Sequence, residues 1–198
     1  MKIFLLLMRN PLTLLRTTAR VILRAMVPTA LLCGMGIASV QAAPTIPWPA
    51  GWEVGNGPPL TNSSGEAVQG SQVIATKRGP PGILAAISVW TLARPANSPE
   101  RLQEGLRALI NATVENNKKQ GLGTRCTPVA QTRAGGLPAL SAGCDTSRSK
   151  DGVQTMRQII TMTSSKSAIY VLTYYAAPRS FDTYKGNFDA LSQHIQLP

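Results

Sequence analysis

Residues 168–177 read AIYVLTYYAA, and residues 178–197, which follow directly, read PRSFDTYKGNFDALSQHIQL. The first stretch is dense in β-branched and aromatic residues and predicts a strand. In the second, apolar residues recur at steps of three and four, which predicts a helix that begins near Ser180 or Asp182. Its apolar stripe consists of Phe181, Tyr184, Phe188, Leu191 and Ile195. Because strand side chains alternate, Tyr170 and Tyr174 share one face and Tyr175 points to the other, and we expect one of the two faces to meet this helix.

Turn signals divide the chain before this strand into further strands and one more helix. The helix begins with Ser98 as N-cap and Pro99 as first residue, and Gly121 follows its polar end. The expected strands cover residues 66–77, 83–92, 125–133, 137–147 and 153–164. The predicted order is β-β-α-β-β-β-β-α. Short turns between neighbouring strands predict an antiparallel sheet flanked by helices, an α+β fold.

The N-terminal segment, residues 1–42, has the pattern of an export signal. It carries five basic residues and no acidic one, becomes apolar over residues 25–40, and ends in Val40-Gln41-Ala42, a motif that a signal peptidase recognises. A retained membrane anchor is the rival interpretation, although an apolar run of 16 residues is shorter than the roughly 20 that span a bilayer. We expect cleavage near Ala42 and a periplasmic or secreted protein.

The remaining chain predicts one domain. Residues 43–65 form a lead-in rich in Pro and Gly, and residues 66–198 form a single α+β domain. Removing the signal's five basic residues lowers the net charge from +11 to +6. These charges are scattered, whereas nucleic-acid binders gather theirs on one face, so we expect no nucleic-acid partner. A weak contact with an anionic membrane surface stays open as an alternative.

Two cysteines remain after the signal, and their positions predict a disulfide. A three-residue loop at 134–136 would place Arg133 opposite Leu137, and the same register places Cys126 directly opposite Cys144. Facing residues of an antiparallel pair are close enough for a disulfide. A redox-active pair is the alternative, but the C-x-x-C spacing is missing. We therefore predict a structural disulfide in an oxidising compartment.

The residues that usually carry catalysis are scarce in this sequence. His194 is the only histidine and lies in the last turn of the closing helix, so no zinc site of the usual kind is expected. Glu100 and Glu104 lie one helical turn apart, but Arg101 and Arg107 close by favour a solvated helix face. No nucleophile, metalloprotease or phosphate-loop motif occurs. We predict no catalytic residue, no metal and no cofactor, and hence a protein that is not an enzyme.

Two tryptophans of the lead-in are the candidate partner contacts. Trp48 and Trp52 stand among prolines and glycines, and aromatic residues are enriched in protein interfaces. Trp48 is the tryptophan that we expect to be most exposed. Either Trp52 or Val54 should pack onto the domain.

The order of elements, with three short motifs, resembles the PsbP-like fold, which includes the photosystem II protein PsbP and the bacterial envelope protein DcrB. The motifs are PAGWEV at 49–54, Gly136-Leu137-Pro138-Ala139, and the closing strand and aromatic helix at 168–197. The resemblance covers most of residues 49–197 and implies an α/β/α sandwich used for accessory and binding roles. The resemblance assigns no catalytic residue to this sequence. The sequence lacks the lipid-attachment motif of DcrB, and the cysteine pair is not general to the fold.

Three functions follow from these observations. The first is a non-catalytic accessory or binding protein whose partner is a protein of the cell envelope. The second is a periplasmic immunity protein that neutralises an interbacterial toxin, and a neighbouring toxin gene would favour it. The third is a hydrolase of unknown substrate, which a buried acidic residue in a deep pocket would favour. The oligomeric state does not follow from the sequence.

Overall fold

A computed structural model of the chain describes residues 43–59, 67–80, 82–93 and 98–198. The export segment predicted at residues 1–42, with its cleavage motif, lies outside these residues. So do Pro81 of the first predicted turn and residues 60–66, which contain the end of the predicted lead-in.

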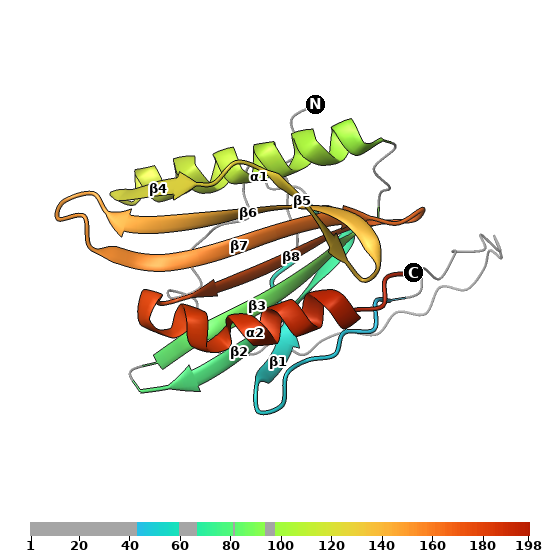
Figure 1. The fold of residues 1–198 in the computed structure, drawn as a ribbon, viewed down its shortest axis with the longest axis horizontal. Helices are drawn as coiled ribbons and strands as arrows, with labels where there is room; N and C mark the ends of the chain where they lie inside the picture. The colour runs from blue at the N-terminus through green and yellow to red at the C-terminus, as the bar shows by residue number, and fades with distance from the viewer. Residues whose placement is uncertain (1–42, 60–66, 81, 94–97) are drawn as a thin grey trace, which may run out of the picture.

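Within the described residues, eight strands form one sheet and two helices pack against it (Figure 1). In chain order the elements are β1 (Glu53–Asn56), β2 (Gly70–Gly79), β3 (Gly82–Leu92), α1 (Pro99–Lys119), β4 (Leu122–Cys126), β5 (Ala130–Ala134), β6 (Leu137–Arg148), β7 (Gln154–Ser164), β8 (Ile169–Ala176) and α2 (Pro178–His194).

The strands lie in the order β1-β2-β3-β8-β7-β6-β4, and β5 also pairs with β6. Every neighbouring pair is antiparallel. The predicted α+β class, an antiparallel sheet flanked by helices, is confirmed. The two strands that bracket β8 are β3 and β7, so the stretch from which the prediction started is central to the sheet.

Two apolar cores lie on opposite faces of the sheet, one under each helix. Tyr170, Leu172 and Tyr174 of β8 pack in the core that contains the buried residues of α2. Val171, which lies between them, packs in the core that contains Leu106 and its neighbours on α1. The alternation along β8 therefore separates the α2-side core from the α1-side core, as a two-residue period requires.

Both helices begin with proline at the first helical turn. In α1 the backbone N–H of Arg101 donates to Ser98 Oγ at 3.3 Å, so Ser98 is the predicted N-cap. Gly121, just past the end, has a φ of 74°. In α2 the helix begins at Pro178, two to four residues earlier than predicted, and no side chain caps it. A proline suits the first helical position because its missing N–H would be unpaired there in any case.

The structure differs from the predicted order at two places. Residues 53–56 of the predicted lead-in form β1, which pairs with β2. The single strand predicted at 125–133 is interrupted, and β4 and β5 are its two parts. Pro128 lies in the interruption, and proline has no N–H to donate to a sheet ladder. The turn after β6 covers residues 149–153, since β6 ends at Arg148 and β7 begins at Gln154.

The interruption also explains the register of the cysteines. The loop between β5 and β6 has two residues, Gly135 and Gly136, with Ala134 opposite Leu137, whereas three residues were predicted. Both glycines have positive φ, as a tight hairpin turn of this length favours. The interruption after β4 contributes one extra residue that compensates for the shorter loop. Cys126 therefore faces Cys144 as predicted.

Candidate functional site

At one end of the sheet a row of hydroxyl side chains crosses three strands. Ser71 of β2 faces Thr91 of β3, and Thr91 faces Tyr170 of β8. Residues directly opposite on antiparallel strands project from the same face. Because Tyr170 belongs to the α2-side core, the row lies on the face that carries α2. It is at the end where β2 and β8 begin and β3 ends.

Two chain segments far apart in sequence meet next to this row. Thr45 and Gln196 form an antiparallel bridge, in which the N–H of Thr45 donates to the oxygen of Gln196 at 3.1 Å and the N–H of Gln196 donates back at 3.0 Å. Ile46, Trp48 and Leu197 pack on the α2-side core. We call residues 43–48 and 195–198 the bridged segments.

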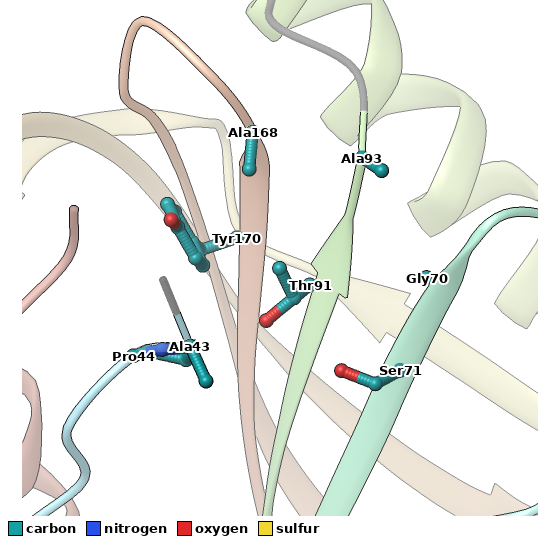
Figure 2. A pocket seen from close by; sticks show the side chains of 8 residues that line it. All are labelled: Ala43, Pro44, Gly70, Ser71, Thr91, Ala93, Ala168 and Tyr170. Carbon is teal, nitrogen blue, oxygen red and sulfur yellow. The ribbon is translucent and has the colours of Figure 1, made fainter. Parts of the chain in front are cut away.

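A pocket of about 160 Å³ lies between Ala43 and Pro44, at the start of the first bridged segment, and the end of the sheet (Figure 2). Its lining residues are small or carry a hydroxyl group: Ala43, Pro44, Gly70, Ser71, Thr91, Ala93, Ala168 and Tyr170. An apolar cavity of similar volume, about 150 Å³, holds a benzene molecule. The pocket therefore has room for a small ligand or for one side chain of a partner.

The hydroxyl groups of the pocket differ in what they already contact. Tyr170 is 1% exposed, and its Oη donates to the backbone oxygen of Pro198 at 3.3 Å. Within the described part of the chain, the hydroxyls of Ser71 and Thr91 have no hydrogen-bond partner. Ser71 is exposed and Thr91 is half-buried. These two hydroxyls are thus available to hydrogen-bond an occupant.

The side chains that line the pocket are uncharged. None of the eight residues has an acidic, basic or thiol side chain. These side chains therefore offer no charged group to an occupant at neutral pH. The hydroxyls and small apolar groups can instead orient and enclose an occupant.

The opposite end of the α2 face is filled by the protein's own side chains. We call this cluster, formed by Tyr174, Phe181, Phe188 and Arg157, the aromatic end. The ring of Tyr174 lies 5.0 Å from that of Phe181 and 5.7 Å from that of Phe188. The guanidinium of Arg157 lies 4.1 Å from the centre of the Phe181 ring, a cation–π contact.

Charged groups at the aromatic end hold Arg157 in place. Its guanidinium contacts Asp145 at 3.4 Å and Asp182 at 3.2 Å. The hydroxyl of Tyr174 donates to the oxygen of Phe181 at 2.6 Å. Burial, reinforced by the carboxylate of Asp182, raises the pKa of Tyr174 well above its ordinary value. On the other face, burial alone raises the pKa of Tyr175.

None of the predicted site residues lines the pocket. Cys126 and Cys144 form a disulfide between β4 and β6, with their Cα atoms 4.0 Å apart, on the α1 side of the sheet. Trp52 is 9% exposed and packs edge-on against Tyr184, so it is the residue of the lead-in that joins the core. Trp48 is half-buried, and Val54 is 48% exposed. Trp48 is thus the more accessible of the two tryptophans, although it too packs on the α2-side core.

The pocket residues were not predicted from the sequence. Ser71 and Thr91 are single hydroxyl residues at strand ends, a pattern that many sheets share. Their alignment depends on the β2–β3 register, which shifts between Lys77 and Arg78. The position of the turn between β2 and β3 therefore does not by itself predict that Ser71 faces Thr91.

The described residues contain neither a cluster of metal ligands nor a membrane-spanning helix. In the ranges that the structure describes, no three His, Cys, Asp or Glu side chains gather as a metal site would need. His194 lies exposed in the last turn of α2. Neither α1 nor α2, the helices of the described residues, is long and apolar enough to cross a membrane.

Comparison with known proteins identifies a family and a fold. A family model described as "Domain of unknown function (DUF4946)" matches residues 43–197. No curated protein matches the sequence.

Among solved structures, the chain is similar to cyanobacterial PsbP (CyanoP) from Synechocystis sp. PCC 6803, with a TM-score of 0.56 and 14% identity over 87% of this chain and all of that one. It is also similar to LpqN, a protein involved in cell envelope biogenesis of Mycobacterium tuberculosis, with a TM-score of 0.49 and 17% identity over 80% of this chain and 86% of that one. The likeness to PsbP establishes the PsbP-like fold that the sequence motifs predicted.

Proposed function

The chain belongs to the DUF4946 family, and we propose that it is an exported, non-catalytic accessory protein. It would bind a protein of the cell envelope through the pocket at the end of its sheet. The observation that carries the proposal is the pocket itself. Its eight lining residues offer hydroxyls and small apolar surfaces without a charged side chain or a thiol. Such a lining suits recognition of a side chain from a partner.

Three observations support export. Residues 1–42 have the composition and the closing motif of a signal peptide. The family match begins at Ala43, the residue after the predicted cleavage. The disulfide between Cys126 and Cys144 is typical of proteins that fold in an oxidising compartment.

The pocket suggests how a partner would be held. A cavity of about 160 Å³ accepts one apolar side chain, and the free hydroxyls of Ser71 and Thr91 can hydrogen-bond a polar tip or a neighbouring backbone group. A side chain anchored in a pocket commonly dominates the energy of an interface. Around the pocket, the exposed start of β2 and the bridged segments would form the rest of the surface that contacts the partner.

The test is site-specific photocrosslinking in intact cells. A photoreactive amino acid at Ser71 should crosslink one dominant envelope protein, which mass spectrometry then identifies. The matched control places the same amino acid at Thr132, an exposed strand residue on β5 that does not line the pocket. Equal crosslinking at both positions, or none at Ser71, would contradict the proposal.

A pocket-filling variant sharpens the test. Ser71→Trp should abolish the specific crosslink from a reporter at Ala93, whereas Thr132→Trp should leave it intact. If the partner is a secreted toxin of another bacterium, the accessory role is replaced by an immunity role at the same pocket. A partner resident in the cell envelope supports the accessory role.

A further inference from the structure

The residue that would become the new N-terminus lies in the wall of the pocket. Ala43 and Pro44 both line it, and Figure 2 shows them beside Tyr170, with Thr91 and Ser71 on the next strands of the sheet. Ala43 directly follows the predicted cleavage motif Val40-Gln41-Ala42. The predicted processing site and the pocket are therefore adjacent.

We propose that removal of residues 1–42 completes the pocket as a carboxylate-binding site, in which the α-amino group created on Ala43 provides the positive charge. This inference rests on the proposed function, since it names the chemistry that the same pocket recognises. Signal peptidase adds water across the Ala42–Ala43 peptide bond, which leaves a carboxylate on Ala42 and an amine on Ala43. In the unprocessed chain that nitrogen belongs to a neutral amide.

The charge would be new to the pocket, because none of its eight lining side chains carries one. An α-amino group has an ordinary pKa of about 8 and is mostly protonated at neutral pH. The available hydroxyls of Ser71 and Thr91 can donate to the oxygens of the same carboxylate. Charge-assisted hydrogen bonds of this kind are stronger than neutral ones.

The bridged segments restrict where the amine can move. Thr45, two residues beyond Ala43, makes two backbone hydrogen bonds with Gln196 at 3.1 and 3.0 Å. Ile46 then packs on the α2-side core. Only Ala43 and Pro44 separate the amine from this anchor, and Pro44 has a fixed φ. The ammonium group is therefore confined to the neighbourhood of the pocket.

The apolar part of the lining sets the size of the ligand. Ala93, Ala168 and the ring of Tyr170 form apolar parts of the wall of a pocket of about 160 Å³. This volume suits a carboxylate attached to a short apolar group. A free short-chain monocarboxylic acid and the C-terminal residue of a peptide share that chemistry.

The experiment compares two proteins exported from the full-length chain. One has the natural sequence. The other has Gly-Ser inserted between Ala42 and Ala43, so that the same cleavage leaves the charge two residues farther from the pocket. Intact mass establishes the N-terminus of each. The probes are butyrate, acetyl-glycyl-alanine and its C-terminal amide, titrated against the amide signals of Ser71 and Thr91 in NMR spectra.

The natural protein should bind at least one carboxylate probe, and the insertion should weaken that binding by about tenfold or more. The peptide amide should bind weakly to both proteins. Preference for butyrate would indicate a free acid as the ligand, and preference for acetyl-glycyl-alanine would indicate a peptide terminus.

Equal carboxylate binding by both proteins, or no binding by either, would overturn the inference, as would an N-terminus other than Ala43. These failures differ from failure of the proposed function. A specific photocrosslink from Ser71 without charge-dependent carboxylate binding would retain the protein partner and reject the carboxylate site. Charge-dependent carboxylate binding without a crosslinked protein would retain the carboxylate site and reject the protein partner.

Discussion

The two ends of the α2 face are closed in different ways. At the aromatic end, rings from β8 and α2 stack on one another, and the guanidinium of Arg157 covers the Phe181 ring. At the pocket end, Ala43 and Pro44 lie beside the ends of β2, β3 and β8 and line a cavity of about 160 Å³. The first arrangement contributes stability through close packing, and the second leaves room for an occupant. Variants can test whether these two roles are separate.

The largest expected effect comes from opening the aromatic end. Phe181 is 4% exposed and contacts both Tyr174 and Arg157. Phe181→Ala should lower the free energy of unfolding by about 4 kcal/mol, because it leaves a cavity in a packed cluster. Urea denaturation measures the loss. A loss below about 1 kcal/mol would mean that the aromatic end is not the main support of this face.

Removing the disulfide should have a smaller effect and should spare both ends of the α2 face. Cys126 and Cys144 lie on the other side of the sheet, in the α1-side core. The double variant Cys126→Ser/Cys144→Ser should lose about 2 kcal/mol, less than the roughly 3 kcal/mol that loop closure alone suggests, because the hairpin already joins the strands. Calorimetry gives the loss. The crosslink from Ser71 should persist, and its disappearance would connect the disulfide to the pocket.

A third variant disturbs the pocket end through the backbone. Gly135 donates its N–H to the oxygen of Ser192 at 2.8 Å, and a Cβ added there would lie 2.5 Å from the oxygen of Ile195. Gly135→Ala should cost about 2 kcal/mol and displace residues 195–198. Gly136→Ala is the matched control, since Gly136 also has positive φ but its Cβ would meet nothing within 4 Å. Equal melting temperatures for the two variants would argue against the close contact.

The smallest effect concerns a single hydroxyl at the aromatic end. Tyr174→Phe removes the hydrogen bond to Phe181 and should cost about 1 kcal/mol at neutral pH. The pKa of Tyr174 is raised in the folded protein, so its contribution is present below about pH 10 and is lost as the pH rises further. The wild type should therefore lose more stability than the variant above pH 10. Urea denaturation of both proteins at neutral pH and above pH 10 measures this difference. An equal loss of stability in the wild type and the variant would contradict the expectation.

The parts of the molecule that the sequence predicted are those governed by local pattern. The alternation of Tyr170 and Tyr174, the stripe on α2 and the N-cap Ser98 all depend on residues a few positions apart. The pocket depends instead on the register of three strands and on contacts between segments about 150 residues apart, as in the bridge from Thr45 to Gln196. Local periodicity carries no information on such contacts.

The cysteine pair shows how a correct pairing can rest on an incomplete account. Two one-residue differences, a shorter turn at Gly135 and an extra residue around Pro128, compensate for each other. Either difference alone would have moved Cys126 out of register with Cys144. Proline in a predicted strand was the signal that could have revealed the interruption.

The bridge between Thr45 and Gln196 also has a kinetic consequence. Contacts between residues so distant in sequence require closure of nearly the whole domain, and they form late when a chain folds. Two peripheral hydrogen bonds can also break without unfolding the sheet, because local opening costs less than global unfolding. The amide hydrogens of Thr45 and Gln196 should then exchange with solvent faster than those of β8. The bridge is therefore expected to form late in folding and to open before the central strands of the sheet.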